Sequence, residues 1–224
     1  MFMGEMKLVE RLILASASPR RRRLLSLLGV PFVAIAAEVD ERAREGENAR
    51  ALVRRLSLAK ARAVARIHSP ECPIVAADTV VVLDSEVLGK PANPAEAVTM
   101  LQRLRGRGHL VLSGVAVLDP ASGRAVSELA ETVVWMRPYG EEELARYVAS
   151  GDPLDKAGAY AIQHRDFNPV ERVEGCYASV MGLPLCHLVR ALRGLGLTPP
   201  ADVPRACQEF TGHDCPLAEE ILAP

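Results

Sequence analysis

The sequence predicts an α/β fold in which a mixed β-sheet is flanked by helices, and three observations support this expectation. Apolar runs of strand length alternate with stretches of helical periodicity along the chain. Two strand-like segments, residues 109–118 and 124–136, are separated only by a turn rich in Asp, Pro, Ser and Gly, which indicates an antiparallel hairpin. The 49% hydrophobic content of the 224 residues is enough to build a sizeable core.

The first strand and helix form one unit with a basic junction. Residues 12–15 are an apolar run, Ser18 suits an N-cap, Pro19 suits the first helical position, and leucines then recur at helical spacing until Gly29. The free N–H groups of the first helical turn therefore face the end of the strand, where four arginines, Arg20 to Arg23, also gather. This arrangement favours a polyanionic ligand, although a solvated basic helix face is the commoner explanation of such a run.

The later elements are expected from the same two periodicities. The expected strands are residues 31–36, 73–83, 87–88, 109–118, 124–136 and 158–163. The expected helices are residues 48–67, 95–104, 141–151 and 185–195, of which the last begins after Pro184. Residues 1–197 are expected to form one domain, followed by an acidic, proline-containing tail over residues 198–224 with one short helix near its end.

The positions of two charged residues within these elements need a physical explanation. Asp78 lies in the middle of the apolar strand over residues 73–83. Because a lone buried charge is costly, Asp78 must be paired, bind a metal, or lie where the strand emerges into a cleft. Lys60 lies on the basic side of the helix over residues 48–67, and we expect it to be a surface lysine unless that face borders a site.

Charge and composition narrow the classes of partner. The formal net charge of −1 argues against bulk affinity for nucleic acid or membranes. The tail carries one basic against five acidic residues, so the rest of the chain has a net charge of +3, which suits a small anionic ligand. No apolar run reaches the length of a membrane span, and residues 1–14 lack the apolar core of a secretory signal, so we expect a cytoplasmic protein.

The five cysteines show no C-x-x-C spacing, which argues against a disulfide framework or a structural zinc site. Cys207, His213 and Cys215 could form a partial metal-binding knuckle, but coincidence is the commoner explanation of three such residues in a tail rich in proline.

Four polar clusters interrupt the apolar elements, and together they suit a metal-bound triphosphate. They are Ser16 to Arg21, Glu38 with Asp40 and Glu41, Asp78 with Thr79, and Gly89 to Pro91. Arginine, lysine and main-chain N–H groups bind phosphate oxygens, whereas carboxylates at strand ends suit Mg²⁺. No P-loop motif is present, so a P-loop nucleotide hydrolase is excluded.

The motifs resemble, in order, those of the Maf proteins, a family of nucleotide pyrophosphatases with an ITPase-like fold. They are S-A-S-P-R-R (16–21), E-V-D-E (38–41), A-D-T (77–79), G-K-P (89–91), K-A-G-A-Y-A-I-Q (156–163) and G-L-P (182–184), and the resemblance covers roughly residues 12–195. It implies cleavage of a nucleoside triphosphate into the monophosphate and pyrophosphate with a divalent metal, Mg²⁺ or Mn²⁺. It also implies that Asp78 is the proton acceptor.

We expect each polar residue to have a distinct role in that reaction. Glu38 and Asp78 are predicted to hold the metal, with Asp78 also orienting or deprotonating the attacking water. The residues predicted to neutralise or contact the phosphates are Ser16, Arg20, Arg21, Lys60 and Lys90.

The resemblance also distinguishes two branches of the family by their substrate. One branch prefers dTTP and UTP and has Arg, Thr and Gln at the positions matching Arg20, Thr79 and Gln163, as here. The other prefers 7-methyl-GTP and has a tryptophan at the position of Arg20. The amide of Gln163 offers one donor and one acceptor, which complements the N3–H and O4 edge of uracil or thymine.

The sequence departs from the family's motifs in two places, and it leaves two other functions open. The chain departs from the family in residues 164–171, which are more charged than usual, and in residues 176–179. These departures concern loop contacts near the base or a dimer interface, and the sequence leaves open whether the protein forms a homodimer. The competing functions are a 7-methyl-GTP pyrophosphatase and a non-catalytic regulator of septum formation that binds a nucleotide or nucleic acid through Arg20 to Arg23.

Overall fold

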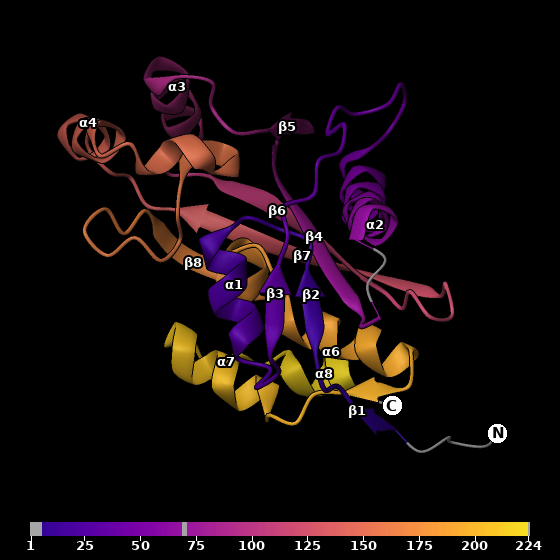
Figure 1. The fold of residues 1–224 in the computed structure, drawn as a ribbon. Coiled ribbons are helices and arrows are strands. Elements are labelled where there is room, and N and C mark those ends of the chain that lie inside the picture. The colour runs from indigo at the N-terminus through magenta and orange to yellow at the C-terminus, as the bar shows by residue number, and fades with distance from the viewer. Residues whose placement is uncertain (1–5, 69–70, 224) are drawn as a thin grey trace.

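Seven strands form one mixed β-sheet within residues 6–68 and 71–223, which the computed structural model describes (Figure 1). They are β2 (Leu12–Leu14), β3 (Phe32–Ala34), β4 (Ile74–Leu83), β5 (Glu86–Leu88), β6 (Gly108–Leu118), β7 (Ala125–Met136) and β8 (Val170–Glu174). Their order is β3-β2-β4-β6-β7-β8, with β5 beside β4. β2 pairs in parallel with β3 and β4, and the other pairs are antiparallel, so the predicted mixed sheet is confirmed.

The two faces of the sheet are covered by different helices because side chains alternate along β6. The helices are α1 (Pro19–Ser26), α2 (Ala49–His68), α3 (Pro94–Leu104), α4 (Glu141–Ala149), α5 (Tyr177–Val180), α6 (Leu185–Gly194), α7 (Val203–Thr211) and α8 (Ala218–Leu222). Leu112 packs with Leu52 and Val53 of α2, whereas Val115 belongs to the main core with Leu188 of α6. No helix in the described part of the chain is long and apolar enough to cross a bilayer.

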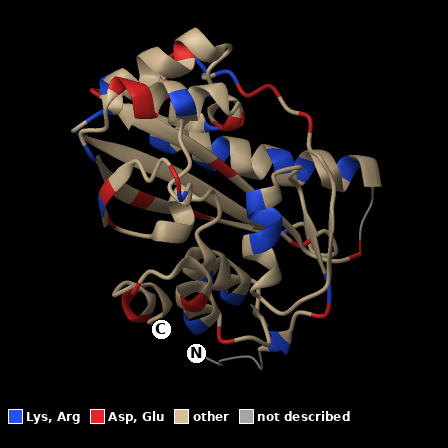
Figure 2. Ribbon diagram, turned by 90° about the vertical axis from the view of Figure 1, so that its left-hand side faces the viewer, with Lys and Arg blue, Asp and Glu red and all other residues tan. Residues whose placement is uncertain are grey.

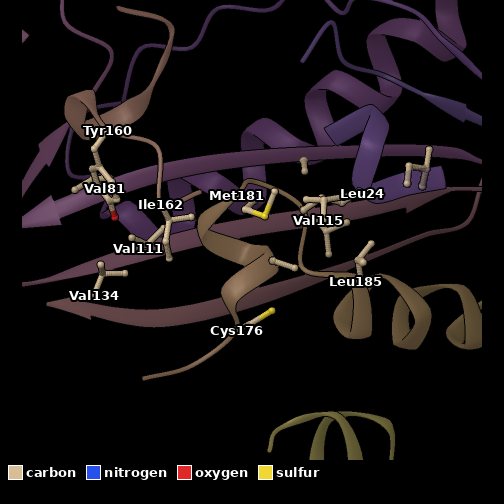
Figure 3. Packing of buried hydrophobic residues seen from close by; sticks show 14 of the residues in the cluster. Leu24, Val81, Val111, Val115, Val134, Tyr160, Ile162, Cys176, Met181 and Leu185 are labelled. Carbon is tan, nitrogen blue, oxygen red and sulfur yellow. The ribbon is translucent and has the colours of Figure 1, made fainter. Parts of the chain in front are cut away.

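Residues 158–163 are not a strand, so that expectation was wrong. The chain forms two short 3₁₀ helices here, η1 (Asp152–Asp155) and η2 (Ala157–Ala159), and then a turn. Gly158 and Ala159 both have a positive φ, 69° and 60°, which extended strands do not tolerate. The apolar character of the segment serves packing instead, because Tyr160 and Ile162 are buried in the core beside Val81 and Val111 (Figure 3).

The segment after α6 folds onto the rest of the protein. Leu197–Thr198 forms β9, which pairs in parallel with β1 (Lys7–Leu8). Two helices, α7 and α8, then follow where one was expected, and both lie beside α6 (Figure 1). The short pieces β1, β8, β9 and α5 were also missed from the sequence. Residues 1–5, part of the segment judged not to be a secretory signal, lie outside the described residues.

Two buried histidines predict a loss of stability in mild acid. Burial lowers the pKa of His109 and of His187 to about 4, below the ordinary value of 6.5. The unfolded chain therefore binds protons that the folded protein does not as the pH falls from about 6.5 toward about 4. We expect the free energy of unfolding, measured with urea, to fall between pH 7 and pH 5.

The carboxylates with lowered pKa values do not affect the stability between pH 7 and pH 5. Glu47 and Glu143 have lowered pKa values, so their contribution is lost only below about pH 4.5. The control is the double variant His109→Gln/His187→Gln, in which the slope between pH 7 and pH 5 is expected to flatten. An unchanged slope in that variant would show that other groups are responsible.

Candidate active site

A cleft of about 620 Å³ lies where the first turn of α1, the middle of β4 and the inner face of α2 meet. Eight of the nine residues predicted for the site line it: Ser16, Arg20, Arg21, Lys60, Asp78, Thr79, Lys90 and Gln163. Lys and Arg residues recur along the ribbons of α1 and α2, the two helices that border this cleft (Figure 2). Arg20 and Asp78, which are far apart in the sequence, therefore border the same space.

The start of α1 is built as the sequence predicts. Ser18 is the N-cap and its Oγ accepts a hydrogen bond from the main-chain N of Arg21 at 3.5 Å, with Pro19 at the first helical position. The Oγ of Ser16 accepts from the main-chain N of Ser18 at 3.2 Å. Pro19 has no N–H, and the N–H groups of Arg21 and Arg22 are bonded to Ser18, so the positive end of the helix dipole is what favours an anion in the cleft here.

Arg21 is held in place by three oxygen atoms before any ligand arrives. Its Nε donates to the carbonyl oxygen of Gly182 at 2.8 Å, its Nη1 to the Oγ of Ser16 at 3.5 Å, and its Nη2 to the Oγ1 of Thr79 at 3.4 Å. Burial lowers the pKa of Arg21, and the charge of Asp78 opposes that effect. Its guanidinium is thus fixed at the side of the cleft that α1 forms.

Lys60 is not a surface lysine, because its side chain is buried between two carboxylates. Its Nζ lies 2.6 Å from Oδ1 of Asp78 and 2.6 Å from Oε1 of Glu41. Both Lys60 and Asp78 are only 7% exposed. Asp78 is therefore paired and also lines a cleft, which are two of the three situations expected for a charge inside an apolar strand.

The reason for the burial of Lys60 is a close contact between α2 and the sheet. A Cβ atom on Gly114 of β6 would lie 2.4 Å from the carbonyl oxygen of Val53, so only glycine allows this approach. Lys60 follows Val53 by seven residues, about two helical turns, and therefore lies on the same face of α2. The face of α2 that carries Lys60 therefore packs against the sheet beside Asp78.

Glu38 lies outside the cleft, and Glu41 is the acidic residue of its segment that lines it, which corrects the expected placement. The segment has no regular secondary structure here, and Val39 packs against the cluster formed by α2 and β4. Both glutamates are exposed to solvent, but Glu41 pairs with Lys60 and lines the cleft, whereas Glu38 does neither. Burial acts to raise the pKa of Glu41, but the hydrogen bond and charge of Lys60 outweigh it, so the pKa is lowered.

One acidic and one basic residue that line the cleft, Asp155 and Lys156, were given no role from the sequence. Asp155 of η1 forms an ion pair with Arg20 at 3.5 Å and lines the cleft. Lys156 is buried, and its Nζ donates to Oδ1 of Asp155 at 2.6 Å and to Oδ1 of Asp152 at 2.9 Å. Lys156 opens the K-A-G-A-Y-A-I-Q motif, which was the available signal, but no role was assigned to it.

The loop that carries Gln163 is anchored by two tyrosines. The hydroxyl of Tyr147 accepts from the main-chain N of Ala161 at 3.0 Å and donates to Oδ2 of Asp152 at 2.8 Å. Tyr160 lines the cleft, and its hydroxyl lies 2.8 Å from Nε2 of the buried His109. These bonds hold the wall of the cleft near Gln163 in one conformation.

The residues that could hold a metal are the two carboxylates around Lys60. Among the described residues, no three Asp, Glu, His or Cys side chains are arranged to hold an ion by themselves, and this includes Cys207, His213 and Cys215. Glu41 and Asp78 nevertheless meet around the ammonium group of Lys60, so a cationic group already lies between them. A small donor set of this kind fits Mg²⁺ or Mn²⁺, which takes its remaining ligands from phosphate oxygens and water.

Comparisons with known proteins find a family model and relatives that match most of the chain. The family model described as Maf-like protein matches residues 11–195. A dTTP/UTP pyrophosphatase of Symbiobacterium thermophilum is 47% identical over 188 residues, covering 84% of this chain and 95% of that protein. One of Syntrophus aciditrophicus is 43% identical over 189 residues, covering 84% and 92%. A solved HAM1 protein of Coxiella burnetii aligns with a TM-score of 0.44 at 16% identity, covering 70% of this chain and 90% of that one.

Proposed function

Since the chain belongs to the Maf-like protein family, we propose that it is a nucleoside triphosphate pyrophosphatase that converts dTTP and UTP to the monophosphates and pyrophosphate. The observation that carries the proposal is the meeting of Arg21 at the start of α1 with the Asp78–Lys60–Glu41 cluster in one cleft. One side of the cleft therefore binds phosphate oxygens, and the other supplies carboxylates.

Asp78 is the group proposed to move a proton. Its carboxylate accepts a proton from a water molecule as that water attacks the α-phosphorus. The bond from the α-phosphorus to the bridging oxygen breaks, and pyrophosphate leaves with the electron pair of that bond. The buried position of Asp78 beside Lys60 keeps the carboxylate paired until substrate arrives.

The cations stabilise charge rather than form bonds with the substrate. Arg20 and Arg21 contact the phosphates from α1, and Lys90 lies at the exposed rim of the cleft. Glu41 and Asp78 would hold a divalent cation, which would supply further neutralisation of the phosphate oxygens.

The direct test is a pyrophosphate-release assay with dTTP, UTP and 7-methyl-GTP in Mg²⁺ or Mn²⁺. We expect release from dTTP and UTP. Preferential cleavage of 7-methyl-GTP would assign the other branch of the family. If all three nucleotides stay intact while the protein binds nucleic acid with a steep salt dependence, the non-catalytic regulator replaces this proposal.

Gln163→Glu is expected to lower kcat/KM for dTTP and UTP by about tenfold or more, because a carboxylate cannot donate a hydrogen bond to O4 of the base. The measurement is kcat/KM across a panel that includes dTTP, UTP and CTP. An equal loss on every nucleotide would show that Gln163 does not read the base.

The acidic residues of the E-V-D-E motif are expected to differ in their effect on metal dependence. Glu41→Gln should raise the Mg²⁺ or Mn²⁺ concentration needed for half-maximal activity by about tenfold, since it removes one anionic ligand. Glu38→Gln is the matched control, and its metal titration should equal that of the wild type. The opposite pattern would return the metal-binding role to Glu38.

A further inference from the structure

A line of buried hydroxyl groups leads from the cleft into the sheet behind it. Thr79 of β4 lines the cleft and lies opposite Ser113 of β6 in the strand pairing. Their hydroxyl oxygens are 2.7 Å apart, and the Oγ of Ser113 is 2.7 Å from the carbonyl oxygen of Ser179. Ser113 is fully buried and does not line the cleft.

The carbonyl at the end of this line determines where the hydroxyl protons lie. A carbonyl oxygen can only accept, so at 2.7 Å the hydroxyl proton of Ser113 must point to Ser179. Ser113 then has no proton left for Thr79, and at 2.7 Å the proton between them must come from Thr79. The hydroxyl of Thr79 therefore turns its lone pairs, and not its proton, toward the cleft.

The end of the line is itself anchored. The Oγ of Ser179 donates to the carbonyl oxygen of Cys176 at 2.7 Å and lies 2.8 Å from the Oγ1 of Thr132. Thr132 in turn accepts from the main-chain N of Cys176 at 3.0 Å. Because α5 is tied to β7 in this way, the carbonyl of Ser179 stays where Ser113 can reach it.

A lone pair facing the cleft suits the neighbouring guanidinium. The Nη2 of Arg21 lies 3.4 Å from the Oγ1 of Thr79, and Nη2 can only donate. With Gly182 and Ser16, Thr79 completes the set of three acceptors, so three of the five N–H donors of Arg21 are used and two remain for phosphate oxygens.

We propose that Ser113 is a positioning residue for the triphosphate: it holds the Thr79 hydroxyl as an acceptor and thereby fixes Arg21 for phosphate binding. The inference rests on the proposed function for its substrate. Without Ser113, the hydroxyl of Thr79 turns freely and presents its proton to the cation for part of the time. Substrate binding weakens, whereas the proton transfer at Asp78 is unaffected.

The test is a double-mutant cycle with Ser113→Ala, Thr79→Val and the double variant, measuring kcat and KM for dTTP and UTP. Ser113→Ala is expected to raise KM by about three- to tenfold, the range for one hydrogen bond, and to change kcat by less than about twofold. In the Thr79→Val background, Ser113→Ala should have almost no further effect, because no hydroxyl is left to orient. Effects that multiply instead would make the role of Ser113 purely structural and overturn the proposal.

Two further variants separate positioning from packing. Ser57→Ala removes another fully buried serine hydroxyl, which donates to the carbonyl oxygen of Arg54 within α2, and should leave KM unchanged. Should Ser113→Ala fail to fold, Ser113→Cys fills the site with a slightly larger thiol that is only a weak donor, and its KM should still rise. An unchanged KM in that variant would also overturn the proposal.

The same measurements distinguish a failure of the role proposed for Ser113 from a failure of the proposed function. If the wild type releases no pyrophosphate from any nucleotide, the proposed function fails. The affinity for dTTP, measured by calorimetry without metal, then replaces KM in the same cycle. If the wild type is active and the effects multiply, only the role of Ser113 is rejected.

Discussion

Asp78→Asn is expected to lower kcat for dTTP by about a thousandfold, because the amide cannot accept the proton of the attacking water. KM should change far less, since the phosphate contacts proposed for Arg20 and Arg21 remain. Steady-state kinetics and a nucleotide-affinity measurement on the same protein separate the two effects. A kcat within about tenfold of the wild type would rule out Asp78 as the proton acceptor.

The control for this variant is Asp40→Asn. Asp40 lies in the E-V-D-E segment, is exposed, and is paired with Arg42 outside the cleft. The Asp40→Asn variant should have the kcat and KM of the wild type. Asp78→Asn also removes one of the two partners of the buried Lys60, so its melting temperature should fall, although Glu41 still compensates the ammonium charge. Folded protein without turnover is therefore the expected outcome at 25 °C.

The site could be predicted from the sequence where its residues lie in short, regular motifs. Ser18 and Pro19 mark the start of α1 by local chemistry alone, and Asp78 stands out because a charge inside an apolar strand needs an explanation. Each of these signals is contained within a few neighbouring residues. The structure therefore agrees with the sequence on where α1 begins and on the position of Asp78 at the cleft.

The burial of Lys60 between Asp78 and Glu41 could not be predicted because it depends on a contact between distant segments. Basic residues occupy much of the surface of α2, so its sequence does not show which of them faces inward. That is decided by Gly114, more than fifty residues later, whose missing side chain admits the helix backbone. A helix pattern records amphipathicity but not the partner against which the helix packs.

The choice between Glu38 and Glu41 depended on a subtler local signal. Val39 is the apolar residue of the segment and packs against the core, and Glu41, two residues later, is the acid that pairs with Lys60. The misassigned strand at residues 158–163 had a comparable cause. Its apolar residues are buried by a loop, and the positive φ of Ala159 is not visible in the identity of that residue.

Gly114→Ala is expected to lower the free energy of unfolding by about 2–3 kcal/mol, the range for overpacking a closely packed interface. The new methyl group would lie 2.4 Å from the carbonyl oxygen of Val53, and backbone cannot move aside as a flexible side chain can. Urea unfolding measures the loss. Gly89→Ala is the stability control, because no atom lies within 4 Å of its added methyl group and its backbone is not in the left-handed region.

The same substitution tests how the cleft is assembled. If the contact at Gly114 determines how closely α2 packs on the sheet, the added methyl group pushes the helix outward and moves Lys60 away from Asp78. We then expect kcat/KM for dTTP to fall even under conditions where the protein is fully folded. A destabilised variant with wild-type kcat/KM would mean that Lys60 reaches Asp78 independently of the helix position. Because Lys60 lies about two turns along α2 from Val53, a shift at one position is transmitted to the other by a rigid helix.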